Sequence, residues 1–421
     1  MGTGLILNHR WGRIFVLGLL YLVQGLPFGF QVHALPVYLR EQGVGLEAIG
    51  YSTALALPWA LKFLWAPFVE RFGGGQGSRY KWIAPIQVLM VLGFLLASQV
   101  SPDEHLGRLM VLLLVLNGLA ATQDIAVDGL AVDLLGPSEL GLGNSAQVVG
   151  YKMGMLCSGG VLIWATAWVG WQGAFLSMAA LVGAVAVMIW WMPEPEALAS
   201  EDVEPIVSVY SIIQALKASL YTPGMGWFLL VIATYKMGES FIDVMYKPFL
   251  IDQGVTASQI GLWIGTWGMG ASLLGSVVGG VIAMRFPLIR LLFIAGIIRL
   301  IPEFGQLGLA MNWVAVEPQS VIGISLGEHF AGGVLTTIMF ATMMSWVDRR
   351  IGASHFTLLA CVEVWGKSMA AMGSGWLAVR FGYPGTFGLG IAMGVGFLLL
   401  LIPLLRRREP QSRARPKCDL V

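Results

Sequence analysis

The chain alternates long apolar segments with short polar connections along almost its whole length. A helix that crosses the hydrocarbon core of a bilayer needs about 20 mostly apolar residues. By that rule we predict membrane spans at 13–38, 46–69, 81–100, 107–135, 144–170, 172–192, 225–251, 257–284, 288–311, 319–347, 353–379 and 384–405. The pattern therefore predicts an all-α membrane protein.

The strongest break in this pattern is the segment 193–224, which separates the first six predicted spans from the last six. Its beginning holds Pro193, Pro195 and five acidic residues between Glu194 and Glu204. We divide the chain into an N-terminal six-helix bundle, a cytoplasmic linker that could contain an amphipathic helix, a C-terminal six-helix bundle and a basic cytoplasmic tail. In this order the parts are residues 1–192, 193–224, 225–405 and 406–421.

Lysines and arginines in the connections set the orientation of a multi-pass chain, because cytoplasmic loops carry an excess of both. One side collects Arg10, Arg13, Arg71, Arg79, Lys81, Lys217, Arg285, Arg290, Arg349, Arg350 and the basic residues of the tail. The opposite side receives Arg40, Arg108 and Arg380. Both termini are therefore predicted to be cytoplasmic, which agrees with an even number of spans.

The two halves of the chain repeat each other at two places. The block EQGVGLEAIG at 41–50 returns as DQGVTASQIG at 252–261, 211 residues later. A spacing of 19 residues also recurs between an aspartate and a lysine, in Asp133 with Lys152 and in Asp348 with Lys367. A duplicated six-helix unit resembles the major facilitator transporters. The resemblance implies a 12-helix major facilitator fold of two bundles related by a pseudo-two-fold axis, with the substrate site between them.

Ionisable side chains inside the predicted spans are the candidates for function, because each costs about 2.5–3.5 kcal/mol at the centre of a bilayer. Asp124 and Asp128 stand four residues apart in the fourth span, which places them on one helix face. Lys152 follows on the next helix and is the expected counter-ion. The other candidates fall in the seventh, tenth and eleventh spans, of which the resemblance places the seventh and tenth around a central cavity.

We interpret four acidic residues as proton-coupling groups, namely Asp124, Asp128, Glu239 and Glu328. The substrate-binding candidates are Gln24, Gln123, Lys152, Lys236, His329, Glu363 and Lys367. The alternative for each charge is an ion pair that only locks helices together. Arg299 and Glu303 are predicted to form such a structural pair in a peripheral ninth span, and Lys62 is expected to extend its ammonium group to the membrane interface.

Composition narrows the class of protein. The 421 residues are 57% hydrophobic and 12% charged, with a mean hydropathy of +0.75, whereas soluble domains carry about 25% charged residues. A net charge of +1 without a basic patch predicts no nucleic-acid partner. The three cysteines show no metal or disulfide spacing, so no metal and no cofactor are predicted.

Several motifs resemble one branch of the major facilitators. They are ATQDIAVDGLAVDLL (121–135), LPWALKFLWAPFVERFG (57–73), GYKMGMLCSGG (150–160), GWQGAFLSMAAL (170–181), YKMGE (235–239) and SHFTLLACVEVWGK (354–367). In order and position they are similar to the peptide–acetyl-coenzyme A transporter family, in particular its AmpG-like muropeptide permease branch. The resemblance implies a monomeric, proton-coupled secondary transporter of an anionic amide- or sugar-containing solute, located in a bacterial inner membrane. An acetyl-coenzyme A or other organic-anion carrier of the same family is the alternative.

Two other classes compete with a transporter. A membrane-embedded acyltransferase would need a nucleophile, and the best match is the GxSxG motif at 323–327, which lies within an apolar helix and lacks the strand-turn-helix context of a nucleophile elbow. The chain contains neither an HExxH motif nor a Walker loop. A non-transporting receptor or channel is the other alternative. We therefore predict a transporter and not an enzyme.

Overall fold

The computed structural model describes residues 9–31, 35, 52–73, 79–100, 102–136, 138–192 and 208–406. Within these ranges the chain is helical apart from short turns, and they contain no strand. Three features of the sequence lie outside the described residues: the first repeat block at 41–50, the acidic part of the linker and the basic tail beyond Arg406.

The first half of the chain forms a group of helices that begins with α2. Its elements are α2 (Arg10–Gly29), η2 (Ser52–Ala56), α5 (Leu57–Leu61), η3 (Lys62–Leu64), α6 (Ala66–Gly73), α7 (Tyr80–Ser98), α8 (Pro102–Leu134), α9 (Leu140–Leu156), η4 (Cys157–Val161) and α10 (Leu162–Trp191). Helix α11 (Val209–Leu220) follows and leads into the second half.

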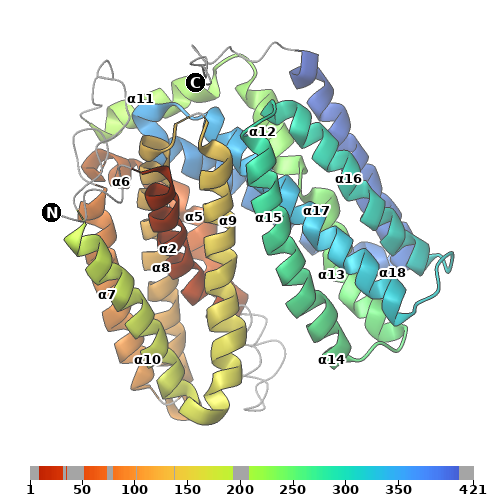
Figure 1. The fold of residues 1–421 in the computed structure, drawn as a ribbon, viewed down its shortest axis with the longest axis horizontal. Helices are drawn as coiled ribbons and strands as arrows, with labels where there is room; N and C mark the ends of the chain where they lie inside the picture. The colour runs from red at the N-terminus through yellow and green to blue at the C-terminus, as the bar shows by residue number, and fades with distance from the viewer. Residues whose placement is uncertain are drawn as a thin grey trace, which may run out of the picture.

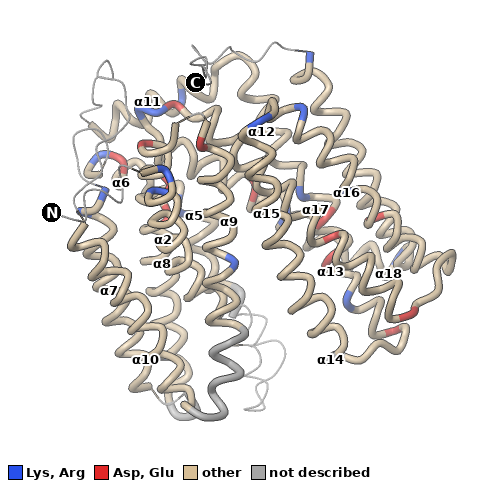
Figure 2. The backbone as a smooth tube through the Cα atoms, viewed as in Figure 1, with Lys and Arg blue, Asp and Glu red and all other residues tan. Residues whose placement is uncertain are grey.

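The second half forms a separate group. Its elements are α12 (Met225–Thr234), α13 (Met237–Asp252), α14 (Ala257–Ile260), η5 (Gly261–Gly268), α15 (Met269–Ala283), α16 (Leu288–Ala310), α17 (Pro318–Ser345), η6 (Arg349–Ile351) and α18 (Gly352–Arg406). Figure 1 shows the two groups side by side, with α11 at the end where they approach each other most closely. In Figure 2, charged positions gather at that end, and a second set lies partway along α13, α16 and α17.

Several predicted spans are interrupted in the structure. Seven described helices are each long and apolar enough to cross a membrane, or up to eight if one bent pair is counted as a span. The predicted second span is divided into η2, α5, η3 and α6, and the seventh is divided into α12 and α13 around Lys236. Conversely, α18 contains both the eleventh and the twelfth predicted spans, which are joined by a sharp kink with non-helical backbone angles at Gly382.

The two halves share a glycine bend that supports the predicted duplication. Gly170 within α10 has φ 65° and ψ −179°, and Gly382 within α18 has φ 67° and ψ 179°. Gly382 follows Gly170 by 212 residues, close to the offset of the repeated blocks. Only glycine adopts this region readily, because a Cβ atom would collide with its own backbone. The same turn therefore separates the last two spans of each half.

We expect Gly382→Ala to destabilise the protein by about 1–3 kcal/mol, since alanine cannot adopt the bend without strain. The matched control is Gly388→Ala in the same helix, where an added Cβ meets no atom within 4 Å and alanine is favoured in a helix interior. Thermal unfolding in detergent compares the two variants. A Gly382→Ala protein as stable as the control would show that the bend does not require glycine.

The two helix groups approach each other most tightly where the backbone of α9 packs directly against the backbone of α15. A Cβ atom on Gly141 would lie 2.3 Å from the carbonyl oxygen of Gly280, so neither helix could hold its position with a larger residue there. One turn further along α9, Ser145 Oγ donates a hydrogen bond of 2.5 Å to the carbonyl oxygen of Ser276. We call this contact between α9 and α15 the seam.

A second contact between the groups links α6 with the first turn of α18. Glu70 Oε2 accepts a hydrogen bond of 2.7 Å from the backbone N–H of Ser354, and its other oxygen accepts one of 2.8 Å from Arg79 Nη2. Arg79 Nε also donates to Asp133 Oδ2 at 3.0 Å. A buried glutamate thereby ties the two halves together near α11.

Candidate substrate and proton site

The first cluster joins two carboxylates of α8 to one ammonium group, and we call Lys62, Asp124 and Asp128 the N-terminal triad. Lys62 forms an ion pair with Asp124 Oδ2, and its Nζ lies 3.7 Å from Asp128 Oδ2. As their four-residue spacing predicts, both carboxylates occupy one face of α8. Only 4% of Lys62, 7% of Asp124 and 1% of Asp128 is exposed, so the triad is almost completely enclosed.

Two predictions about this cluster are wrong. Lys152 is not the counter-ion of Asp124 or Asp128, because its Nζ instead donates a hydrogen bond of 2.5 Å to Ser272 Oγ on α15. Lys62 does not extend to the membrane interface but is buried against α8. The physical reason lies in the broken second span: α5 ends at Leu61, and the tighter η3 turn begins at Lys62, so this side chain leaves the face expected for a continuous helix.

Uncharged polar groups complete the surroundings of the triad. Asp128 Oδ1 accepts hydrogen bonds from the hydroxyl of Tyr21 at 2.8 Å and from Nε2 of Gln147 at 3.0 Å. Gln123 Nε2 donates to the carbonyl oxygen of Leu20 at 3.4 Å. Gln24 and Gln123 were predicted to bind substrate, yet both are fully buried. In this conformation they are part of the interior of the bundle.

The second cluster is organised by one guanidinium group. Arg299 Nη2 lies 2.6 Å from Glu328 Oε1 and 3.2 Å from Glu239 Oε2, while its Nε donates to Glu303 Oε1 at 3.2 Å. These side chains come from α13, α16 and α17. The predicted Arg299–Glu303 pair is thus present, and it is part of a larger cluster because Arg299 connects three helices. We call these four residues the Arg299 cluster.

Further charged groups surround the Arg299 cluster. Lys236 Nζ lies 3.9 Å from Glu239 Oε1, and His329 forms an ion pair with Glu328 when its ring is protonated. His329 Nδ1 also lies 3.0 Å from the carbonyl oxygen of Ser325. A carboxylate oxygen of Asp243 lies within 4.8 Å of those of Glu239 and Glu328. Arg299 already forms ion pairs with two of these three carboxylates, those of Glu239 and Glu328.

A third group lies on α18, where the substrate-binding candidates Glu363 and Lys367 meet. Lys367 Nζ donates to both carboxylate oxygens of Glu363, at 3.1 and 3.2 Å, and the hydroxyl of Tyr235 donates to Glu363 Oε1 at 3.4 Å. The side chain of Lys367 is 38% exposed whereas that of Glu363 is 5% exposed. The ammonium therefore remains accessible to a further anion.

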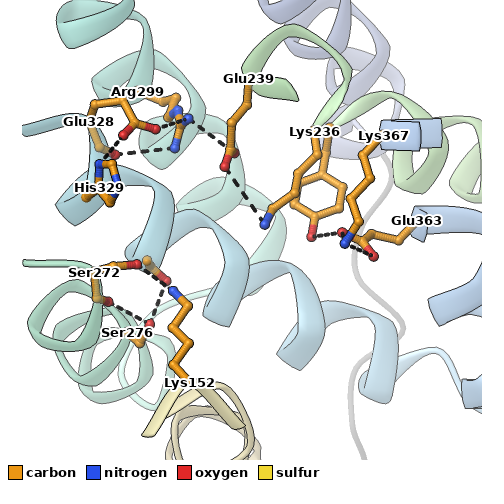
Figure 3. A network of polar contacts seen from close by, with 12 residues as sticks. Lys152, Lys236, Glu239, Ser272, Ser276, Arg299, Glu328, His329, Glu363 and Lys367 are labelled. Atoms are coloured by element: carbon orange, nitrogen blue, oxygen red, sulfur yellow. Dashed lines mark hydrogen bonds and ion pairs between the residues drawn. The ribbon is translucent and has the colours of Figure 1, made fainter. Parts of the chain in front are cut away.

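Figure 3 shows how the predicted residues of the C-terminal half face one another. Lys236 lies between the Arg299 cluster and the Glu363–Lys367 pair, and Lys152 points from α9 toward Ser272 on α15. Lys152 is also near enough to Lys236 and Glu239 for their charges to interact. The structure therefore places six of the predicted residues in two clusters and one pair, with Lys236 and His329 beside the Arg299 cluster and Lys152 between the bundles. No ion pair among the described residues joins the N-terminal triad to the Arg299 cluster.

Several contributors to these clusters were not predicted as site residues, among them Lys62, Arg299, Tyr21 and Gln147. Lys62 follows Pro58 by four residues, and a proline at the start of a helix signals that the preceding span is broken. Arg299 was recognised as one of a pair, but its partners on α13 and α17 are far away in the sequence. The GxSxG motif at 323–327 lies in the middle of α17, without the exposed turn that a nucleophile requires.

We expect Lys62→Met to lower the free energy of unfolding by about 3–5 kcal/mol, because removing the cation leaves two buried carboxylates unbalanced. The double variant Lys62→Met/Asp124→Asn is expected to recover part of this loss, since it removes one of those charges. Thermal unfolding in detergent measures both, with Lys247→Met on the exposed side of α13 as the control. Equal losses in the single and double variants would contradict direct coupling of Lys62 to Asp124.

The arrangement of two helix groups, each with charged clusters in its interior, is that of the major facilitator fold. The proton:xylose symporter XylE superimposes with a TM-score of 0.69 at 13% identity, covering 94% of this chain and 97% of that one. The transporter FucP in its outward conformation gives a TM-score of 0.70 at 14% identity, covering 94% and 99%. These similarities establish the fold.

Sequence comparisons indicate the particular branch. A family model described as Acetyl-coenzyme A transporter 1 matches residues 13–166. The anhydromuropeptide permease of Escherichia coli (strain K12) is 28% identical over 409 residues, covering 94% of this chain and 82% of that protein. The putative transporter AmpG 4 of Rickettsia felis is 26% identical over 417 residues, covering 96% and 99%. The family resemblance predicted from the motifs is confirmed, and these relatives are permeases and transporters, as predicted for a chain that is not an enzyme.

Proposed function

We propose that this protein is a proton-coupled secondary transporter that moves an anionic, muropeptide-like solute across the membrane by alternating access. The observation that carries the proton coupling is the N-terminal triad, in which one ammonium group faces two carboxylates. Lys62 balances one negative charge, and a second uncompensated carboxylate in an enclosed site is costly. A proton on Asp124 or Asp128 removes that cost, so the triad favours binding one proton.

The substrate part of the proposal rests on three lysines. Lys152, Lys236 and Lys367 come from α9, the break between α12 and α13, and α18, and they surround the region between the bundles. None of them is fully buried. Carboxylate or phosphate groups of a solute would replace water around these ammonium groups, while Glu239 and Glu328 could accept protons that accompany the solute.

The location follows from the same proposal. We place the chain in a bacterial inner membrane as a monomer, with both termini in the cytoplasm. The relatives support a bacterial membrane, because the permease of Escherichia coli covers most of this chain. The gathering of charged positions at the end where α11 lies supports that end as the cytoplasmic one.

A second candidate substrate is an acetyl-coenzyme A-type anion. The match of residues 13–166 to the acetyl-coenzyme A transporter model favours it, and lysines bind phosphate as readily as carboxylate. Uptake of radiolabelled anhydromuropeptide and of radiolabelled acetyl-coenzyme A into proteoliposomes tests which of the two substrates the protein carries. Saturable uptake of the anhydromuropeptide alone would select the muropeptide-like substrate.

We expect Asp124→Asn to abolish uptake driven by an inward proton gradient, because the triad loses a group that binds the coupling proton. Exchange of labelled for unlabelled solute without a gradient should persist, since that cycle needs no net proton movement. Asp252→Asn is the control: this aspartate accepts a hydrogen bond from Tyr383 at an exposed helix end. Gradient-driven accumulation by Asp124→Asn at the level of the unmodified protein would remove Asp124 from the coupling step.

A further inference from the structure

Lys152 occupies an unusual position at the seam. Along α9, Gly141, Ser145 and Lys152 face α15, where they meet Gly280, Ser276 and Ser272 in that order. The first two contacts bring backbone and hydroxyl groups together. At the third, a charged side chain of one bundle is held by a neutral hydroxyl group of the other.

The ammonium group of Lys152 has no carboxylate partner within 4.0 Å among the described residues. Glu239 and Glu328 are the acidic groups whose charges act on the ammonium group of Lys152. Both are already paired with Arg299. A hydrogen bond from an ammonium group to a hydroxyl is weaker than one to an oxyanion, which is charge-assisted on both sides. An oxyanion that enters between the bundles therefore competes effectively with Ser272 for Lys152.

We propose that Lys152 receives an oxyanion of the substrate, a carboxylate or a phosphate, and in doing so releases Ser272, so that substrate binding loosens the seam. This inference rests on the proposed transport function. It makes one side chain, that of Lys152, responsible for coupling substrate binding to separation of the bundles. Removing the Lys152–Ser272 bond lowers the free energy needed to part α9 from α15. When no substrate is bound, the Lys152–Ser272 bond acts together with the Ser145–Ser276 and Gly141–Gly280 contacts to keep the seam closed.

A native cysteine reports on separation of the bundles. Cys361 on α18 is fully buried, and its thiol lies 3.8 Å from the carbonyl oxygen of Trp59 on α5 in the other bundle. Parting the two groups exposes this thiol. Alkylation of Cys361 by N-ethylmaleimide, in a background with Cys157→Ser and Cys418→Ser, therefore measures opening independently of transport.

The test compares an anhydromuropeptide with the same compound after amidation of its carboxyl groups. In the Cys361 background, the native compound is expected to accelerate alkylation, and the amidated compound is expected to do so only at about tenfold or higher concentration, the loss expected for one charge-assisted hydrogen bond. Lys152→Gln should respond to both compounds equally weakly, and Lys152→Arg should restore the discrimination. Ser272→Ala should raise alkylation without any substrate.

Lys247→Gln serves as the control, because this exposed lysine of α13 lies outside the clusters described above. Equal discrimination by Lys152→Gln and the unmodified protein would overturn the inference, as would an unchanged basal alkylation rate in Ser272→Ala. Acetyl-coenzyme A used as a second probe distinguishes a phosphate from a carboxylate as the anion that Lys152 receives.

Failure of this inference is distinguishable from failure of the proposed function. If Lys152→Gln discriminates normally while proton-driven uptake persists, Lys152 has no role in anion binding but the protein is still a transporter. If the unmodified protein shows neither uptake of the two labelled probes nor a change in Cys361 alkylation, the proposed function fails.

Discussion

A charged side chain inside a bilayer is stable only when another charge or a dense set of hydrogen bonds compensates it, and this constraint organises the interior of the protein. Each half meets it differently. In the first half one lysine faces two aspartates, so the charge balance remains incomplete without a proton. In the second half one arginine binds three glutamates, with Lys236 and His329 at the edge of the cluster.

These two solutions suit different tasks. The Arg299 cluster links α13, α16 and α17 through a planar guanidinium that donates in several directions at once, which favours a rigid body. The N-terminal triad depends on a flexible lysine at an irregular turn, and its environment changes with one proton. Between the two bundles the seam combines glycine contacts, which allow backbones to touch, with one lysine that lacks a carboxylate partner. Under the proposed function, the Arg299 cluster would hold one half together, the N-terminal triad would bind the proton, and the seam would part during alternating access.

Much of the site was visible in the sequence because spacing along one helix is a local property. The four-residue interval between Asp124 and Asp128 predicts a shared face, which the structure contains. The same interval brings Glu363 and Lys367 together on α18. The errors arose where a partner comes from another helix. Lys62 precedes α8 and Lys152 follows it in the sequence, and nothing in the order of residues distinguishes which of them approaches the aspartates.

The sequence by itself determined the membrane class, the duplicated helical organisation and the presence of costly charges in particular spans, because hydrophobic length, repeat spacing and composition are read directly along the chain. The tertiary structure decided which charges compensate each other. That choice depended on where helices break, as at η3 and between α12 and α13, and on how closely glycines let α9 and α15 approach. Breaks and close approaches rotate side chains by amounts that periodicity cannot specify, so Lys62 joined the aspartates and Lys152 was left at the interface.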